Sequence, residues 1–180
     1  TVASAASAAP YVDVHTVVDL GGTLEFGEFF WDEEGAPAKG AIRVVVDLNA
    51  EQMYVYRGGF EIARTRVTRG WDKHVTPTGI FPILQKKAEH YSSIYDNAPM
   101  PYTLRLTWDG VAIHGADVDS TGATHGCIGV PLEFAQKLFA NVKIGTKIYV
   151  TKDWMLSTYS HQDNSVATID VETTDPEIFN

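Results

Sequence analysis

The sequence predicts a mostly β domain with one main helix, and three observations support this prediction. Short β-branched segments separated by turn residues follow one another from residue 41 onward. A single segment with clear helical periodicity, residues 131–141, comes directly after the only cysteine of the chain. The 180 residues are 44% apolar and 21% charged, which is enough apolar sequence for one domain with a proper core.

Three strands are expected to open the domain. Residues 42–48 and 53–57 are rich in valine, isoleucine and tyrosine, and residues 60–67 alternate between apolar and polar side chains. Gly58-Gly59 separates the second strand from the third, and glycine tolerates the positive φ that a two-residue hairpin turn needs. Short connections between consecutive strands predict a meander.

The second half of the domain carries the helix and the cysteine. Further strands are expected at residues 80–84, 102–108, 111–114 and 144–150, with a long polar loop over 85–101. Asp109-Gly110 is a strong hairpin signal between two of them. The helix follows from the apolar residues Leu132, Ala135, Leu138, Phe139 and Val142, and from Pro131 in its first turn. His114 therefore ends a strand, and Cys127 lies in a loop between that strand and the helix.

The two ends of the chain have a different composition. Residues 1–40 are interpreted as an N-terminal arm or linker, with a strand in 11–20 and an aromatic cluster at Phe26, Phe29, Phe30 and Trp31. Packing of that cluster on the domain is favoured over a role as a lid or groove wall. Residues 152–180 form a polar, acidic C-terminal extension whose expected anchors are Trp154, Met155, Tyr159 and Phe179.

Charge and cysteine content exclude several functions. A net charge of −9 argues against nucleic acid or anionic lipid as the main partner, because both need a basic surface. No stretch of about 18 apolar residues is present, so no membrane span is expected. One cysteine forms neither an internal disulfide nor a multi-cysteine zinc site.

Cys127 is the main candidate for chemistry. It is flanked by glycines and a histidine in a loop, whereas a core cysteine usually sits in an apolar run. A buried structural cysteine is the first alternative. A metal site made by Cys127, His114, His125 and either Asp117 or Asp119 is the weaker alternative, and no metal or other cofactor is expected.

A histidine could activate this thiol by taking its proton and holding a thiolate–imidazolium pair. His125 lies two residues before the cysteine and His114 lies thirteen before it. The amides of Gly126 and Cys127 could point at a developing oxyanion.

These residues carry a resemblance to a known family. Ile113-His114-Gly115, a glycine-containing loop and then Thr124-His125-Gly126-Cys127 resemble the signature of the L,D-transpeptidase (YkuD-like) catalytic domain. The further segments that resemble the family are Met53-Tyr54-Val55-Tyr56 with Gly58-Gly59, Thr76-Pro77-Thr78-Gly79-Ile80-Phe81, Met100-Pro101-Tyr102 and Gly145-Thr146. The similarity covers residues 41–151, which are expected to form the catalytic domain.

The resemblance implies a β-sandwich-like fold and a role in peptidoglycan biosynthesis, cell wall organisation and cell shape. It implies an exported bacterial protein of the periplasm or cell envelope. Its partners would be peptidoglycan stem peptides. By similarity, Cys127 attacks the carbonyl before the terminal D-alanine of a stem tetrapeptide, releases D-alanine and forms a thioester. An amine of a second stem then resolves the thioester and gives a 3-3 cross-link.

The resemblance also assigns roles to single residues. His114 matches the general base and His125 a supporting position, while Gly126 and Cys127 would supply the oxyanion hole. Thr124 would orient the base histidine. The expected substrate contacts are Tyr102 and Gly115.

One departure from the family pattern concerns the second residue after the cysteine. The family usually has arginine there, and this chain has Gly129. Besides an L,D-transpeptidase, two alternatives therefore stay open. One is an L,D-carboxypeptidase, in which water resolves the thioester, and the other is a non-catalytic cell-wall-binding module.

Overall fold

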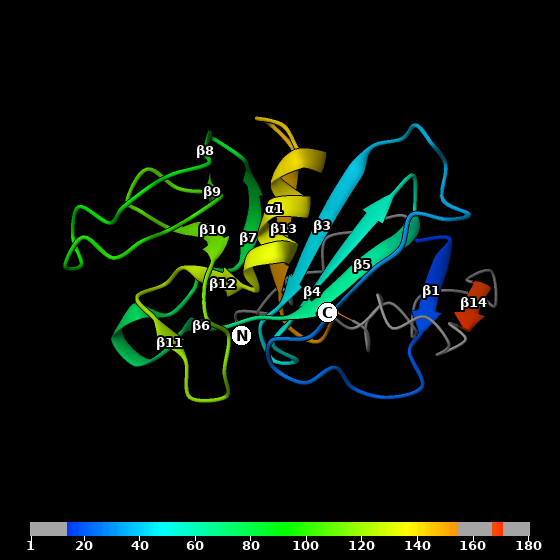
Figure 1. Cartoon of the computed structure of the whole chain (residues 1–180), viewed down its shortest axis with the longest axis horizontal. Coiled ribbons are helices and arrows are strands. Elements are labelled where there is room, and N and C mark those ends of the chain that lie inside the picture. The colour runs from blue at the N-terminus through cyan, green and yellow to red at the C-terminus, as the bar shows by residue number, and fades with distance from the viewer. Residues whose placement is uncertain (1–13, 155–166, 171–180) are drawn as a thin grey trace, which may run out of the picture.

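The structure is a computed structural model, and it describes residues 14–154 and 167–170 (Figure 1). Strands dominate this part of the chain, so the predicted mostly β fold is confirmed. In chain order the elements are β1 (Thr16–Asp19), β2 (Phe29–Trp31), β3 (Ile42–Asp47), β4 (Gln52–Arg57), β5 (Phe60–Arg66), β6 (Arg69–Gly70), the 3-10 helix η1 (Asp72–His74), β7 (Gly79–Pro82), β8 (Gln85–Lys87), β9 (Thr103–Arg105), β10 (Ala112–Gly115), β11 (Ala123–Thr124), β12 (Ile128–Val130), α1 (Leu132–Asn141), β13 (Lys147–Thr151) and β14 (Ala167–Asp170).

The predicted meander forms the centre of a large mixed sheet. Strands β3, β4 and β5 pair antiparallel in succession, and the turn between β4 and β5 has φ values of 56° at Gly58 and 85° at Gly59. These two values explain why the sequence places two glycines there. The full strand order is β14-β1-β5-β4-β3-β13-β7. Strand β2 lies outside this order and pairs antiparallel with residues 63–65 of β5.

A smaller sheet of order β12-β10-β9-β8 lies at the opposite end of the molecule from β1 and β14 (Figure 1). One core cluster joins both sheets and the helix. It contains Val44 and Val55 from the large sheet, Leu104 and Ile113 from the small one, and Phe134 from α1. The small sheet therefore has one face fixed on the core and the other face free to carry a site.

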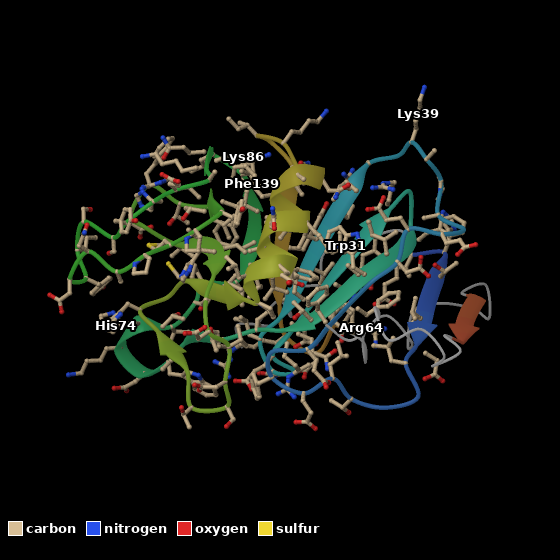
Figure 2. The ribbon with its side chains drawn as sticks, viewed as in Figure 1. Trp31, Lys39, Arg64, His74, Lys86 and Phe139 are labelled. Atoms are coloured by element: carbon tan, nitrogen blue, oxygen red, sulfur yellow. The ribbon has the colours of Figure 1, made fainter. Side chains whose placement is uncertain are left out.

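The helix predicted over 131–141 is confirmed at Leu132–Asn141, directly after Pro131. Its buried residues are Phe134, Ala135 and Leu138. Lys86 of β8 donates from Nζ to the carbonyl oxygens of Phe139 and Val142, each at 2.6 Å. Lys86 and Phe139 lie together beside this end of α1 (Figure 2). These bonds satisfy carbonyls that the last helical turn leaves unpaired.

The N-terminal arm packs onto the domain through its aromatic residues. Phe29 and Trp31 of β2 contact the Phe134 ring edge-on, with centroid distances of 5.8 and 5.3 Å. Within the strand predicted over 11–20, β1 occupies residues 16–19, and residues 11–13 lie outside the described part of the chain. None of the cavity-lining residues described below belongs to this arm.

Some elements differ from the sequence prediction. Residues 85–101, expected as a loop, begin with strand β8, and Met100 N then donates to His90 O at 2.8 Å across a hairpin-like extension. Strand β12 lies where only a loop was expected. At the C-terminal end, Trp154 is buried, whereas the other expected anchors Met155, Tyr159 and Phe179 lie outside the described residues.

Among the residues that the structure places, no helix has the length and hydropathy that a membrane crossing requires.

Candidate active site

A cavity of about 380 Å³ opens on the free face of the small sheet. Its wall comes from four parts of the chain: the segment around η1, the hairpin-like extension of β8 and β9, residues 109–112 at the turn into β10, and the cysteine loop. Cys127, Gly126 and His125 all line it. The only cysteine of the chain is thus accessible from a concave surface, as a catalytic thiol must be and a core cysteine is not.

Strand register brings Cys127 and His114 to the same face of the sheet. Strands β10 and β12 pair in parallel, with Ile113 opposite Ile128 and His114 opposite Gly129. Alternate residues of a strand share a face, so Cys127 lies on the face of Gly129 and therefore of His114. The farther histidine, His114, therefore shares a sheet face with the thiol.

The thiol of Cys127 is half-buried and donates from Sγ to the Gly110 carbonyl at 3.5 Å. Burial raises its pKa above the ordinary cysteine value, while the Ala112 backbone N–H and the positive charge of Arg105 act in the opposite direction. The net direction is upward, which favours the protonated thiol over the thiolate.

His114, the base expected from the sequence, does not itself line the cavity. Its Nδ1 lies 2.9 Å from the Gly115 carbonyl oxygen, which fixes the ring and leaves the lone pair on Nε2. Burial lowers its pKa, the hydrogen bond to Gly115 raises it, and the charge of His90 lowers it, with a downward net direction. Burial thus disfavours the charged form of each group, whereas the pair expected from the sequence is a thiolate with an imidazolium.

Thr124 and Gly126 shape the cysteine loop. The Thr124 hydroxyl donates to the Cys127 carbonyl and accepts from the Gly126 amide at 3.3 Å. These bonds hold the loop itself, whereas the family resemblance implied a contact with the base histidine. Gly126 has a φ of 107°, a left-handed conformation that favours glycine.

His125 lies at the cavity rim instead of beside the thiol. Its ring stacks on Tyr95 with a centroid distance of 3.9 Å and meets the His74 ring edge-on at 5.0 Å. Figure 2 labels His74 near β11, at the side of the cavity that η1 forms. An exposed aromatic set of this kind suits contact with substrate rather than proton transfer.

The two expected substrate contacts, Tyr102 and Gly115, do not line the cavity. The Tyr102 ring packs edge-on against Phe139, with a centroid distance of 5.6 Å. Gly115 is buried where a Cβ would lie 3.1 Å from a Leu132 side-chain carbon and 3.3 Å from Pro101. Its carbonyl serves the site by holding His114, and its missing side chain allows α1 to pack closely.

Two residues of the site were not identified as such from the sequence. Buried Thr76 donates to the Gly126 carbonyl and accepts from the Gly70 amide, both at 2.9 Å. Gly70 has no room for a side chain, because a Cβ there would lie 1.8 Å from the His74 carbonyl oxygen. The Thr76-Pro77-Thr78-Gly79 segment was the available signal, and its threonine hydroxyl ties the cysteine loop to the segment before η1.

The structure also accounts for glycine at position 129. A Cβ there would lie 2.4 Å from Thr68 Oγ1 and 3.2 Å from the Ala116 Cβ. Thr68 is buried and its backbone pairs with Gly129 in both directions, at 3.0 and 3.1 Å. The Thr68 side chain therefore fills the space into which a side chain at position 129 would have to grow.

The described residues contain no group of three or more histidine, cysteine, aspartate or glutamate side chains arranged to hold a metal ion. The combination of Cys127, His114 and His125 with Asp117 or Asp119 is thus not a metal cluster in this structure.

Comparison with known proteins gives one family. A family model described as the L,D-transpeptidase catalytic domain, YkuD, matches residues 41–150. No sequence among curated proteins matches the chain.

Solved structures with a similar fold include L,D-transpeptidases. One from Stackebrandtia nassauensis is 23% identical with a TM-score of 0.57, covering 67% of this chain and 61% of its own. One in complex with imipenem is 25% identical with a TM-score of 0.57, covering 62% of this chain and 59% of its own. An Enterococcus faecium cysteine-to-serine mutant is 27% identical with a TM-score of 0.54, covering 62% of this chain and 50% of its own. The chain thus spans about half to three-fifths of the length of these relatives.

Proposed function

Because the chain belongs to the family of L,D-transpeptidase catalytic domains, we propose that it is an exported cysteine acyltransferase that cross-links peptidoglycan stem peptides. The observation that carries this function is the placement of Cys127 at a cavity, on the same sheet face as His114. A thiol on the same sheet face as an imidazole whose ring orientation is fixed supports the roles of nucleophile and base.

In the first step, Nε2 of His114 takes the proton of the Cys127 thiol as the sulfur attacks the carbonyl before the terminal D-alanine. The carbonyl electron pair moves to oxygen and gives a tetrahedral oxyanion. The Cys127 amide, which Thr124 does not occupy, is the first donor to that oxyanion. The Gly126 amide is the second, after it exchanges its long bond to Thr124 for the stronger charged acceptor.

In the second step, the oxyanion collapses and the carbon–nitrogen bond breaks. The His114 imidazolium returns its proton to the leaving nitrogen, so D-alanine departs as a neutral amine and a thioester remains on Cys127. In the third step, an amine from a second stem attacks the thioester, and His114 takes the proton that this amine loses. The carbon–sulfur bond breaks, His114 gives this proton to the departing sulfur, and the products are a 3-3 cross-link and the free thiol.

The fate of a purified tetrapeptide stem, followed by mass spectrometry with and without an acceptor stem, tests this function. Free D-alanine together with a cross-linked dimer is the expected result. Free D-alanine with trimmed monomer alone would assign the chain to L,D-carboxypeptidases, in which water resolves the thioester. A folded protein that binds the stem and releases no D-alanine would make it a non-catalytic cell-wall-binding module.

A further inference from the structure

Arg105 occupies the same sheet row as the nucleophile. Antiparallel strands β9 and β10 place Arg105 opposite Ala112. Cys127 directly precedes β12, so continuing the parallel register of β10 with β12 by one residue places Cys127 beside Ala112. The neighbouring Leu104 belongs to the core cluster, so Arg105 points to the opposite face, which carries the cavity. Two strand spacings separate Arg105 from Cys127, which is about 10 Å between their Cα atoms.

The Arg105 guanidinium has no hydrogen bond or ion pair to any residue that the structure describes. Its aromatic neighbour is the exposed ring of Trp108, whose centroid lies 5.9 Å from the guanidinium carbon. Arg57 and Arg64, by contrast, form ion pairs with Glu33 at 2.8 Å and with Glu61 at 2.7 Å. A half-buried guanidinium with five unused donors beside a cavity is available for a ligand.

The cavity is positive although the chain is acidic. Asp109 is the only acidic residue that lines it, and its carboxylate accepts a short hydrogen bond from the Thr107 hydroxyl. Arg105 and Lys73 are the fully charged cations of the lining. Since the whole chain carries a net charge of −9, this local reversal of sign indicates an anionic ligand.

The reach of the side chain selects which anion. In an acyl donor, the terminal carboxylate lies about 4 Å from the carbonyl carbon that the sulfur attacks. An extended arginine side chain spans the remaining distance between the Arg105 backbone and that carboxylate. Its planar guanidinium fits a carboxylate with two parallel hydrogen bonds. On the premise of the proposed function, we propose that Arg105 binds the free terminal carboxylate of the residue that leaves from the acyl donor.

This contact makes the site specific for donors that end in a free carboxylate. Donors with an amidated end lose a charge-assisted pair, which corresponds to a roughly 10- to 100-fold lower rate of reaction with Cys127. Arg105 is a substrate-binding residue in this account and transfers no proton.

Two matched electrophiles test the contact without requiring transpeptidation. Chloroacetyl-D-alanine and its amide both alkylate a thiol, as the sulfur displaces chloride and forms a thioether, and they differ only in the terminal carboxylate. Alkylation rates of Cys127 are measured by intact-protein mass. Wild type is expected to prefer the acid, Arg105→Gln to lose that preference by at least tenfold, and Arg105→Lys to retain part of it. Lys87→Gln, which removes an exposed charge outside the cavity lining, is the charge control and is expected to match wild type.

An acid-to-amide ratio that is the same in wild type and Arg105→Gln overturns the assignment. A ratio that falls in Lys73→Gln and not in Arg105→Gln overturns it as well, because the carboxylate then binds at η1. Circular dichroism and the rate with the neutral amide verify that each variant is folded and has a reactive thiol. Alkylation is independent of cross-linking. If the acid-to-amide ratio falls in Arg105→Gln as expected, but wild type releases no D-alanine from stems, the proposed function is contradicted and the carboxylate contact stands.

Discussion

Gly129→Ala is expected to destabilise the cysteine loop, because a Cβ at position 129 would lie 2.4 Å from the Thr68 hydroxyl oxygen. That separation is well inside van der Waals contact, and Thr68 is held by backbone hydrogen bonds to Gly129 on both sides. Because these backbone bonds hold both residues in place, the Thr68 hydroxyl can move away from position 129 only by changing its rotamer. Overpacking at a buried site of this kind costs about 1–3 kcal/mol of unfolding free energy.

Removing the opposing hydroxyl should relieve the clash. In Thr68→Ala the nearest remaining atom of residue 68 is its Cβ, which lies 3.7 Å from the place that an alanine Cβ would take at position 129, an ordinary contact distance. The double variant Thr68→Ala/Gly129→Ala should therefore be more stable than the sum of the single effects, by about 1 kcal/mol or more. Because the same two side chains meet, their effects cannot be independent.

The cycle is measured by urea unfolding followed by circular dichroism. Gly22→Ala is the matched control, since no atom lies within 4 Å of its Cβ position, and it should unfold like wild type. In a chain of this size, 1 kcal/mol corresponds to a change of about 2–4 °C in Tm. Additive effects of Thr68→Ala and Gly129→Ala, or a Gly129→Ala variant as stable as the control, would refute the account of position 129.

Three further predictions concern hydrogen bonds and charge. Thr76→Val should lower the free energy of unfolding by about 1–3 kcal/mol and should also lower the acylation rate, because it leaves the Gly126 carbonyl without its buried donor. Thr76→Ser keeps the hydroxyl and should retain most of the stability and of the rate. Equal losses in the two variants would contradict this role of Thr76. Alkylation of Cys127 by iodoacetamide should titrate above the range of an ordinary thiol, because only the thiolate reacts and burial raises the thiol pKa; a midpoint below that range would restore the ion-pair interpretation. Glu61→Ala should lower the free energy of unfolding in urea by about 3–5 kcal/mol, because it leaves the buried Arg64 unpaired. Glu33→Ala removes an exposed partner and should lower it by under about 1 kcal/mol. Similar losses in the two variants would argue against the buried pair.

The strands and the helix that the sequence predicts share strong local signals. Residues 42–47 and 52–57 are β-branched and aromatic, and Gly58-Gly59 supplies the positive φ of the turn between strands. The helix has its apolar residues at helical spacing and a proline before its first turn. Such segments are stable in the conformation that their own sequence favours, so tertiary contacts change little.

Elements fixed by distant contacts could not be predicted. Strand β12 has three residues, and its pairing with β10 depends on a parallel register that no local pattern encodes. Strand β8 is the polar sequence Gln-Lys-Lys, which is typical of a loop until Lys86 meets the end of α1. Backbone pairing of Thr68 with Gly129 likewise joins segments that are far apart in the chain.

The candidate site divides in the same way. Cys127 and His114 follow from residue type and from the family pattern, because chemistry restricts which side chains serve as nucleophile and base. Thr76 and Arg105 were not assigned to the site, since a threonine in a turn and an arginine in a strand acquire roles only through register and packing. Tyr102 was expected to contact substrate because it belongs to a segment that resembles the family, yet its ring packs against Phe139 and does not line the cavity.

We propose that Cys127 is the acylated nucleophile and that His114 is its base. Intact-protein mass after exposure to imipenem, with which one similar L,D-transpeptidase has been solved in complex, distinguishes the two roles. Wild type should gain one adduct, Cys127→Ala none, and His114→Ala should react at least 100-fold more slowly. An adduct that persists in Cys127→Ala, or a folded wild type that gains none, would contradict the claim.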